Sequence, residues 1–519
     1  MGSKRGEPAR AGLVVMALVG LIVLAIGLVA TRDGLYIGLR DAPTYLSSSE
    51  NLANGNGFVM SFGDPGKPID FASSDSPVVD FPAGYPITLS AGVAAGLSST
   101  DWARWLGIAL MTSIAVVVAW VALDSGLSVS WAGLAALIGA ALSLPYVVSP
   151  MSELLYGLLL VTSLGLLGRF ARRRGEVFFV VGALTAAAAM TVRTIGIALL
   201  ATAVVVGLLT PGRKAVRGLR LLFTVVVGAV PIALLIGGGG SRELAWHPAG
   251  SVDLKVMANT IAGWFIPPLG GPTMRVALLV VVVAALFLWV RSGVEVEAEA
   301  GERVWRRLWF PGAVSALAHF TVLVVSRFVF DAQNTPNPRL LYPTVLSLLV
   351  AGVAGFPELR QEGRSARRRK GLALISVAML VAASWGAAQE FGSASDASSF
   401  GSEAFRTSPA VTEVLDMSPD VLVFSNVPDG LWAAGRSGVR PLPVTVDPLS
   451  TRPNPLLEEE TDRIQSAVEA GAVIFYRRGD RDYLLGIDEV RAMAPCVVVD
   501  DGTSLVLTGE NDQSCGAQP

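Results

Sequence analysis

Long uncharged runs of apolar residues recur along most of the chain and predict membrane-spanning helices. A helix needs roughly 20 mostly apolar residues to cross the hydrocarbon core of a bilayer. Runs that approach this length without any Asp, Glu, Lys or Arg cover residues 11–30, 105–123, 131–148, 154–168, 177–192, 194–210, 221–240, 276–290, 308–326, 340–356 and 371–388. The pattern therefore predicts a polytopic α-helical membrane protein with about 11 transmembrane helices.

Two further uncharged stretches do not fit a spanning helix. Residues 81–100 contain Pro82 and Pro86, and residues 256–274 contain Pro267 and Pro268. Proline interrupts a helix because it lacks the backbone N–H and its ring clashes with the preceding turn. We interpret both stretches as juxtamembrane or half-inserted helices on the outer face. The first run, at residues 11–30, reads as a retained membrane anchor rather than a removed signal peptide.

The distribution of basic residues predicts the orientation of the chain in the membrane. Cytoplasmic loops are enriched in Lys and Arg, and the amino-terminal tail carries Lys4, Arg5 and Arg10. Counting spans from a cytoplasmic amino terminus places every dense basic cluster on the same side. These clusters lie in the loops at 169–176, 211–220, 291–307 and 357–370. A multi-pass protein of the plasma membrane is expected, with a large first outer loop at 31–104 and an extracytoplasmic tail.

The tail differs in composition from the preceding chain. A Ser-rich linker at 389–402 separates the transmembrane domain, residues 1–388, from residues 403–519. Short β-prone segments at 421–425, 473–476 and 496–499, with a charged helix at 458–469, predict a small extracytoplasmic α/β domain. Cys496 and Cys515 both lie there, either as a disulfide or as two unpaired thiols. The domain has no catalytic signature, and support or acceptor recognition is the expected role.

Composition excludes several classes of function. Apolar residues make up 52% and charged residues 16% of the 519 residues, and mean hydropathy is +0.56. Since soluble chains carry about 25% charged residues, a soluble enzyme is excluded. The formal net charge of −2 offers no basic field for nucleic acid. With His247 and His319 as the only histidines, a His-rich metal centre is also excluded. His319, inside a span, is expected to hydrogen-bond between helices.

The first outer loop carries three short motifs after the anchor. They are Asp41 with Tyr45 four residues on, the turn Asn54-Gly55-Asn56-Gly57-Phe58, and Pro82-Ala83-Gly84-Tyr85-Pro86 at the entry to an apolar helix. Their order and sidedness resemble the GT-C superfamily of polyprenyl-phosphate-dependent glycosyltransferases, which includes protein O-mannosyltransferases and the lipid A aminoarabinose transferase. The motifs cover roughly residues 10–210, and the rest of the chain is similar only in architecture.

Other outer positions match the same family. Glu153 follows Ser149-Pro150 at an outer turn, where the family often places a second acidic residue. Arg193 precedes Gly196 by three residues, and Arg339 precedes Pro343 by four, as basic residues of the family often do. Some members carry a Lys that contacts the lipid phosphate where this chain has Asp80-Phe81. The resemblance therefore leaves four candidate phosphate ligands, which are Arg193, Arg339, Arg40 and Lys67.

The implied reaction moves a sugar from a polyprenyl-phosphate donor to a hydroxyl of a glycan, lipid or protein acceptor outside the cytoplasm. The departing phosphate needs charge stabilisation, which arginine provides. The acceptor hydroxyl needs a base, and Asp41 is the candidate for a direct, inverting displacement. Glu153 orients the acceptor or shares a divalent Mg or Mn with Asp41; both alternatives stay open, and no other cofactor is expected. Tyr45, Tyr85 and His247 are candidate substrate-binding residues.

Simpler explanations exist for each of these residues. Asp41 and Glu153 suit the first turn of a helix, where the helix dipole favours acidic side chains. Arg193 lies in an otherwise apolar run, so it either faces a partner or cavity or reaches to the lipid headgroups. For the whole protein, a multi-span transporter or lipid flippase and a non-catalytic scaffold for the tail domain are the alternatives.

Overall fold

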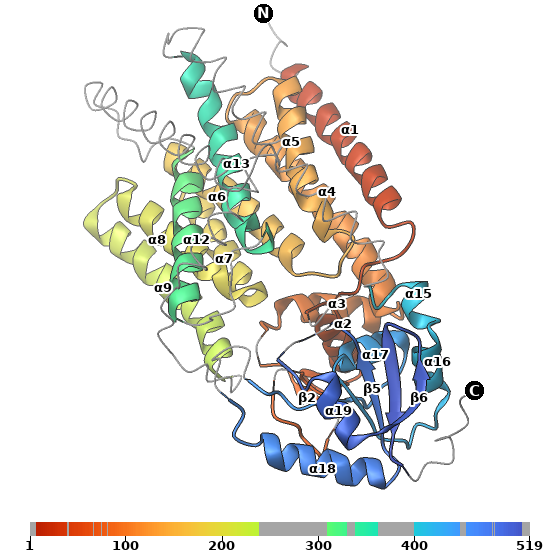
Figure 1. The fold of residues 1–519 in the computed structure, drawn as a ribbon. Helices are drawn as coiled ribbons and strands as arrows, with labels where there is room; N and C mark the ends of the chain where they lie inside the picture. Colours follow the sequence, from red (N-terminus) through yellow and green to blue (C-terminus); the bar gives the residue numbers. More distant parts are fainter. Residues whose placement is uncertain are drawn as a thin grey trace, which may run out of the picture.

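A bundle of apolar helices and a smaller α/β domain make up the protein, with the first outer loop between them (Figure 1). The computed structural model describes residues 7–38, 41–65, 67–73, 75–79, 81–237, 309–329, 338–361, 399–446, 453–479, 481 and 483–510. The α/β domain and α2 and α3 of the outer loop lie at one end of the bundle, and the amino terminus lies at the other.

The helices of the bundle correspond to the predicted membrane spans. They are α1 (Glu7–Ala30), α4 (Ser99–Asp124), α5 (Val129–Ser143), α6 (Glu153–Arg173), α7 (Glu176–Val192), α8 (Ile197–Leu209), α9 (Lys214–Gly237), α12 (Phe310–Val329) and α13 (Pro338–Gln361). Among the described residues, five helical stretches are long and apolar enough to cross a bilayer: α1, α4, α6, α9, and α5 together with the η1 turn (Leu144–Tyr146) that follows it. The predicted spans at 276–290 and 371–388 lie outside the described residues.

Apolar side chains of α1 face away from the rest of the protein. Leu13, Val14 and Leu21 are each more than half exposed in the absence of lipid. Within the bundle, by contrast, small residues let helices approach closely. Gly182 of α7 lies against Leu167 of α6, and its carbonyl accepts a hydrogen bond of 2.9 Å from Ser163 Oγ. Helix packing of this kind replaces the hydrophobic driving force that is missing between helices in lipid.

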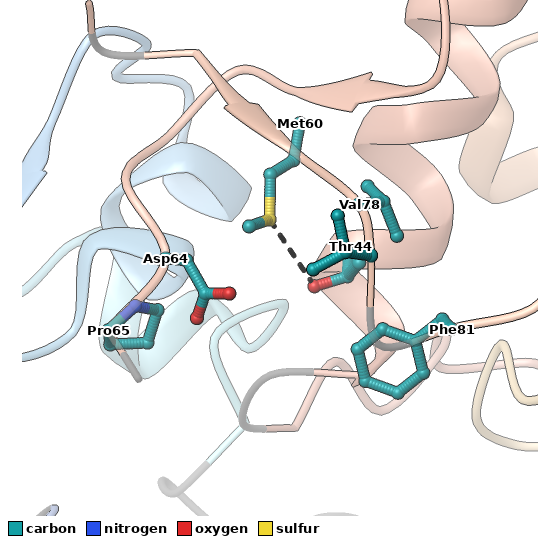
Figure 2. Close-up of a pocket in the computed structure, with 7 residues that line it drawn as sticks. Thr44, Met60, Asp64, Pro65, Val78 and Phe81 are labelled. Carbon is teal, nitrogen blue, oxygen red and sulfur yellow. Dashed lines mark hydrogen bonds between the residues drawn. The ribbon is translucent and has the colours of Figure 1, made fainter. Parts of the chain in front are cut away.

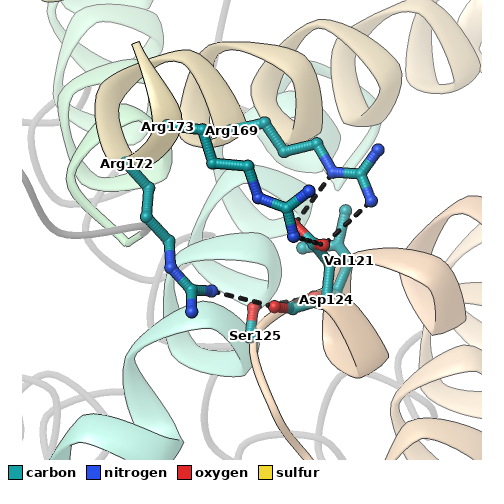
Figure 3. A network of polar contacts seen from close by, with 6 residues as sticks. All are labelled: Val121, Asp124, Ser125, Arg169, Arg172 and Arg173. Atoms are coloured by element: carbon teal, nitrogen blue, oxygen red, sulfur yellow. Dashed lines mark hydrogen bonds and ion pairs between the residues drawn. The ribbon is translucent and has the colours of Figure 1, made fainter. Parts of the chain in front are cut away.

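Three arginines of α6 surround one aspartate at the end of α4 (Figure 3). Arg169 donates to both carboxylate oxygens of Asp124, at 3.0 and 2.8 Å, and its guanidinium lies 4.5 Å from the ring centre of Trp120. Arg173 donates to the same carboxylate, and Arg172 donates to the Asp124 carbonyl oxygen. This arginine cluster links α4 to α6. It lies at the end of the bundle where α1 begins, since Gly12 of α1 lies next to Leu123 of α4.

The first outer loop contains two short helices and a two-stranded sheet. Helix α2 spans Asp41–Ala53, strands β1 (Val59–Met60) and β2 (Ser76–Pro77) pair antiparallel, and α3 spans Gly84–Ala94. With 11 residues, α3 is about 16 Å long and too short to cross a membrane. Residues 81–100 thus contain one short helix and the first residues of α4, which begins at Ser99; the placement of α3 at the outer membrane surface stays a prediction.

The tail folds into a mixed five-stranded sheet with helices around it. Strands β3 (Val423–Ser425), β4 (Arg440–Pro441), β5 (Val473–Arg477), β6 (Cys496–Asp500) and β7 (Ser504–Thr508) are ordered β4-β3-β5-β7-β6. Strand β3 is parallel to β4 and β5, and β7 is antiparallel to β5 and β6. The helices are α15 (Glu403–Arg406), α16 (Pro409–Asp416), α17 (Pro428–Ala434), α18 (Leu457–Glu469) and α19 (Ile487–Met493).

The three predicted strands and the predicted helix of the tail are confirmed by β3, β5, β6 and α18. The sequence prediction missed β7, whose five residues are all buried between β5 and β6. Cys496 at the start of β6 is disulfide-bonded. Cys515, the other cysteine of the chain, lies outside the described residues.

Candidate active site

Four charged side chains from distant parts of the sequence meet at the outer-loop end of the bundle. Arg339 donates through Nη2 to Asp41 Oδ2 and through Nε to Glu153 Oε1. Arg193 forms a second ion pair with Glu153 Oε1. The Glu153 side chain is 1% exposed, whereas those of Arg193, Asp41 and Arg339 are 13%, 15% and 30% exposed. The cluster is thus buried on the Glu153 side and open on the Arg339 side.

Helix ends place all four side chains. Asp41 is the first residue of α2, Glu153 is the first of α6, and Arg339 lies in the first turn of α13. The partial positive charge of a helix amino terminus favours the two carboxylates, so the simpler first-turn explanation accounts for part of their placement. It does not account for Arg339, because the same end of a helix disfavours a cation. The two carboxylates compensate that unfavourable position.

Arg193 lies between α7 and the short η2 helix (Thr194–Gly196), and its backbone is extended, with φ −147° and ψ 135°. Two glycines make this junction possible. A Cβ on Gly196 would lie 2.6 Å from the Met190 backbone, and a Cβ on Gly84 would lie 2.6 Å from the Thr191 carbonyl oxygen. The start of α3 therefore packs directly against the turn that presents Arg193. This contact gives a physical reason for the glycine in the Pro-x-Gly-Tyr-Pro motif.

An aromatic wall borders the charged cluster. The rings of Tyr85 and Phe81 meet the Tyr45 ring edge to face, at 5.2 and 5.3 Å between centroids. The Tyr45 hydroxyl lies 3.3 Å from Ser152 Oγ, which also accepts a hydrogen bond of 3.4 Å from Arg193 Nη1. Burial raises the pKa of both tyrosines, and the nearby Asp41 carboxylate raises that of Tyr45 further. Both phenols therefore remain protonated.

Ser152 is a member of the cluster that the sequence prediction missed. Its position just before Glu153 was the available signal, but a lone serine at a helix start is usually a cap. Here its side chain makes no cap hydrogen bond and instead joins Tyr45 to Arg193.

One carboxylate oxygen of Glu153 has no partner within the described part of the chain. Oε1 accepts from both arginines, but Oε2 is buried and accepts no hydrogen bond from any described residue. Leaving a buried polar atom unpaired costs about 1–3 kcal/mol. An oxygen in this state, beside two guanidinium groups, is suited to accept a hydrogen bond from a bound molecule.

A small hollow lies beside α2, one turn from Asp41 (Figure 2). It is lined by Thr44, Met60, Asp64, Pro65, Val78, Val79 and Phe81. Thr44 Oγ1 donates to Met60 Sδ at 3.8 Å, and Phe81, which lines the hollow, also packs on the Tyr45 ring. The space in the hollow is on the scale of one water molecule, so it is not by itself a substrate pocket.

The remaining candidate residues lie elsewhere. Lys67 Nζ pairs with Asp64 Oδ2 at 3.2 Å, beside the hollow, whereas Arg193 and Arg339 pair with Glu153. Arg40 and His247 lie outside the described residues. His319 of α12 hydrogen-bonds between helices as expected. Its Nε2 lies 2.5 Å from the Tyr156 hydroxyl of α6, and its Nδ1 donates to the Ser315 carbonyl.

The paired carboxylates fit a divalent cation poorly as they stand. Asp41 and Glu153 each bind a guanidinium group, and two positive charges beside them repel a metal ion. Across the described ranges, no group of three or more His, Cys, Asp or Glu side chains has a metal-binding arrangement. We therefore derive no step that passes through a metal.

No protein-family model matches the sequence, and sequence comparison finds no curated relative. The fold does have known counterparts. ArnT from Cupriavidus metallidurans, solved bound to undecaprenyl phosphate, is similar over 97% of this chain and 99% of its own, with a TM-score of 0.58 and 14% identity. The chain therefore has the same overall fold as ArnT.

A second protein of similar fold is the oligosaccharyltransferase of Archaeoglobus fulgidus. Its apo form matches 90% of this chain and 69% of its own, with a TM-score of 0.51 and 13% identity. The complex of that enzyme with Zn and sulfate has a TM-score of 0.51 and 12% identity, over 89% of this chain and 68% of its own. At these identities the likeness establishes the fold of a multi-pass membrane protein, and the chemistry must be argued from the site.

Proposed function

We propose that the protein is an integral-membrane, inverting glycosyltransferase that moves a sugar from a polyprenyl-phosphate donor to an acceptor hydroxyl on the extracytoplasmic side. The observation that carries this proposal is the charged cluster of Asp41, Glu153, Arg193 and Arg339. Two carboxylates and two guanidinium groups from four separate elements meet at one end of a membrane-helix bundle. The GT-C fold, shared with a protein solved with undecaprenyl phosphate, supports a lipid-linked donor.

The two arginines suit the donor phosphate. When the bond between sugar and phosphate breaks, the departing phosphate gains negative charge, and guanidinium groups stabilise that charge through paired hydrogen bonds. Arg339 is 30% exposed and Arg193 is 13% exposed, so a phosphate at the open side of the cluster can reach Arg339 first. We assign Arg339 and Arg193 as phosphate ligands, whereas Lys67 pairs with Asp64.

Asp41 is the proposed general base. An acceptor hydroxyl is a weak nucleophile until a positioned carboxylate takes its proton. Asp41 is the first residue of α2 and binds Arg339, so an acceptor hydroxyl at Asp41 would lie beside the proposed phosphate site. In a single displacement the acceptor oxygen forms the new bond to the sugar, the phosphate leaves with the old bonding electrons, and the proton passes to Asp41.

Glu153 has a different role in this proposal. Because its Oε1 is already bound by both arginines, Glu153 orients the two guanidinium groups. Tyr45 and Tyr85 are buried behind the charged cluster and are proposed to shape the site from beneath.

The arginine cluster at the opposite end of the bundle supports the proposed orientation. Arg169, Arg172 and Arg173 surround Asp124 there, and cytoplasmic loops are the ones enriched in arginine. The proposed location is the plasma membrane, with a cytoplasmic amino terminus. The charged cluster, the outer loop and the α/β domain then face outward.

Sugar transfer by the purified protein in lipid nanodiscs tests the proposal, with a panel of radiolabelled polyprenyl-phosphate sugars and crude envelope glycans as acceptors. We expect wild-type protein to transfer label from at least one donor, and Asp41→Asn to lower the rate by 100-fold or more, on the scale of general-base loss. The matched control is Asp33→Asn, an exposed aspartate in the same loop. Equal rates for Asp41→Asn and wild type would contradict the assignment of Asp41 as general base. A transporter or a scaffold would transfer no sugar with either variant.

A further inference from the structure

The segment that leads from the membrane anchor to Asp41 is held on two sides by other parts of the chain. On one side, Tyr36 N–H donates to the Val148 carbonyl at 2.6 Å, in the turn that precedes Glu153. On the other side, Ile37 N–H donates to Ser399 Oγ at 3.1 Å, and the Ile37 carbonyl accepts from Phe400 N–H at 2.9 Å. Ser399 and Phe400 belong to the tail, more than 350 residues away in sequence.

Ser399 and Phe400 are themselves fixed within the α/β domain. Ser399 is 2% exposed and Phe400 is 1% exposed. The Phe400 ring packs on Phe405 at 5.0 Å, and the Arg477 guanidinium at the end of β5 lies 5.2 Å from its centre. A Cβ on Gly430 of α17 would come within 2.8 Å of the same ring. The clamp on Ile37 is therefore anchored in the sheet and helices of the domain.

Packing continues the clamp to α2. Ile37, and Ala42, Tyr45 and Leu46 of α2, belong to one continuous cluster of buried apolar side chains that also contains Phe400 and the domain residues Val427 and Leu431. A Cβ on Gly401 would lie 3.0 Å from the Leu35 carbonyl oxygen, so the two backbones are in close contact. The helix that begins with Asp41 is thus seated against the domain as well as against the bundle.

The domain grips the outer loop at a second point. Ile69 is buried in the apolar core of the domain, and its N–H donates to Glu460 Oε1 of α18 at 2.7 Å. Phe71 packs near Phe424 of β3, and the Arg463 guanidinium lies 3.9 Å from the centre of the Phe71 ring. The loop on the other side of the hollow is therefore also held by the tail.

We propose that the α/β domain holds Asp41 in its working position, and that Ser399 is a positioning residue for the transfer reaction. The inference rests on the proposed function. Ile37 lies four residues before Asp41, and its N–H is bound by the Ser399 hydroxyl. A displacement of about 1 Å in a catalytic group can cost 100-fold in rate. The α/β domain is therefore essential for sugar transfer because it positions Asp41, although it contributes no catalytic group of its own.

Hydrogen exchange of the full-length protein in detergent tests the clamp without any substrate. Ser399→Ala removes the acceptor of Ile37 N–H, and Ser399→Thr keeps it. We expect peptides covering residues 35–38 to exchange at least tenfold faster in Ser399→Ala than in wild type, and Ser399→Thr to match wild type. The control is Ser402→Ala, which removes the cap of α15 at Phe405 N–H but no contact with Ile37. Unchanged exchange in Ser399→Ala would overturn the proposal.

Transfer kinetics test the consequence for Asp41. We expect Ser399→Ala to lower kcat about tenfold while KM for the donor, binding of undecaprenyl phosphate and Tm stay near wild type, and Ser399→Thr to restore the rate. In an Asp41→Asn background, Ser399→Ala should cost nothing further, because Ser399 acts through Asp41. A kcat within twofold of wild type, or an equal loss in both backgrounds, would overturn the role. Wild-type protein that transfers no sugar would instead refute the proposed function, and the exchange result would still decide the clamp.

Discussion

At the scale of single residues, the charged cluster is balanced by its own members. Each of the two arginines binds Glu153, and Arg339 also binds Asp41. The two positive and two negative formal charges cancel, so a buried charge is never left without a partner. An arriving phosphate can then bind Arg339 at its more exposed side without the removal of an opposing ligand.

Arg339→Lys tests the geometry that the phosphate site requires. Lysine keeps the charge but loses the planar fork that binds two oxygens at once. We expect affinity for undecaprenyl phosphate to fall about tenfold, which corresponds to roughly 1.4 kcal/mol, measured by native mass spectrometry of the protein in detergent. The control is Arg32→Lys, an exposed arginine outside the cluster. Equal losses in the two variants would argue against a specific phosphate ligand.

Chelation tests whether a divalent metal takes part. Since Asp41 and Glu153 are both bound by Arg339, the proposed transfer proceeds without Mg or Mn. Treatment with EDTA followed by gel filtration should leave the transfer rate within twofold of the untreated value. A rate that collapses and returns on addition of Mg or Mn would show that Arg339 gives way to a metal ion.

At the scale of elements, the sequence predicted where the helices lie better than it predicted which side chains of different helices contact one another. The uncharged runs placed nine helices of the described bundle because burial in lipid requires apolar length alone. The residues Asp41, Glu153, Arg193 and Arg339 were each recognisable at a helix end. The contact between Arg339 and Asp41 could not be predicted, because it joins residues 298 positions apart and depends on how the helices pack. In the sequence, Lys67 was as good a candidate phosphate ligand as Arg193 and Arg339. In the structure it pairs with Asp64 instead.

Gly84→Ala tests the packing of α3 against the turn that carries Arg193. An added methyl group would lie 2.6 Å from the Thr191 carbonyl oxygen, so α3 or the turn must shift. We expect a loss of about 1–3 kcal/mol in stability, typical of overpacking, seen as a lower Tm in detergent, together with weaker binding of undecaprenyl phosphate. Gly218→Ala is the control, since a Cβ there meets open space. An unchanged Tm and unchanged binding in Gly84→Ala would show that this contact is not needed.

At the scale of the whole molecule, the candidate site lies where three parts meet. The membrane bundle contributes Glu153, Arg193 and Arg339, the outer loop contributes Asp41, and the α/β domain supports the loop from outside (Figure 1). The sequence separated the domain from the bundle by composition, but it could not show that residues 35–38 and Ile69 join them. Those contacts are single hydrogen bonds and buried side chains that have no periodic signature.

The most direct test of the central claim is the position of a bound carrier lipid. A cryo-electron microscopy structure of the protein in nanodiscs with undecaprenyl phosphate would locate the phosphate group. Our account predicts phosphate density within hydrogen-bonding distance of Arg339 and Arg193, at the same end of the bundle as Asp41. Phosphate bound instead at the arginines around Asp124, or elsewhere away from Asp41, would contradict it.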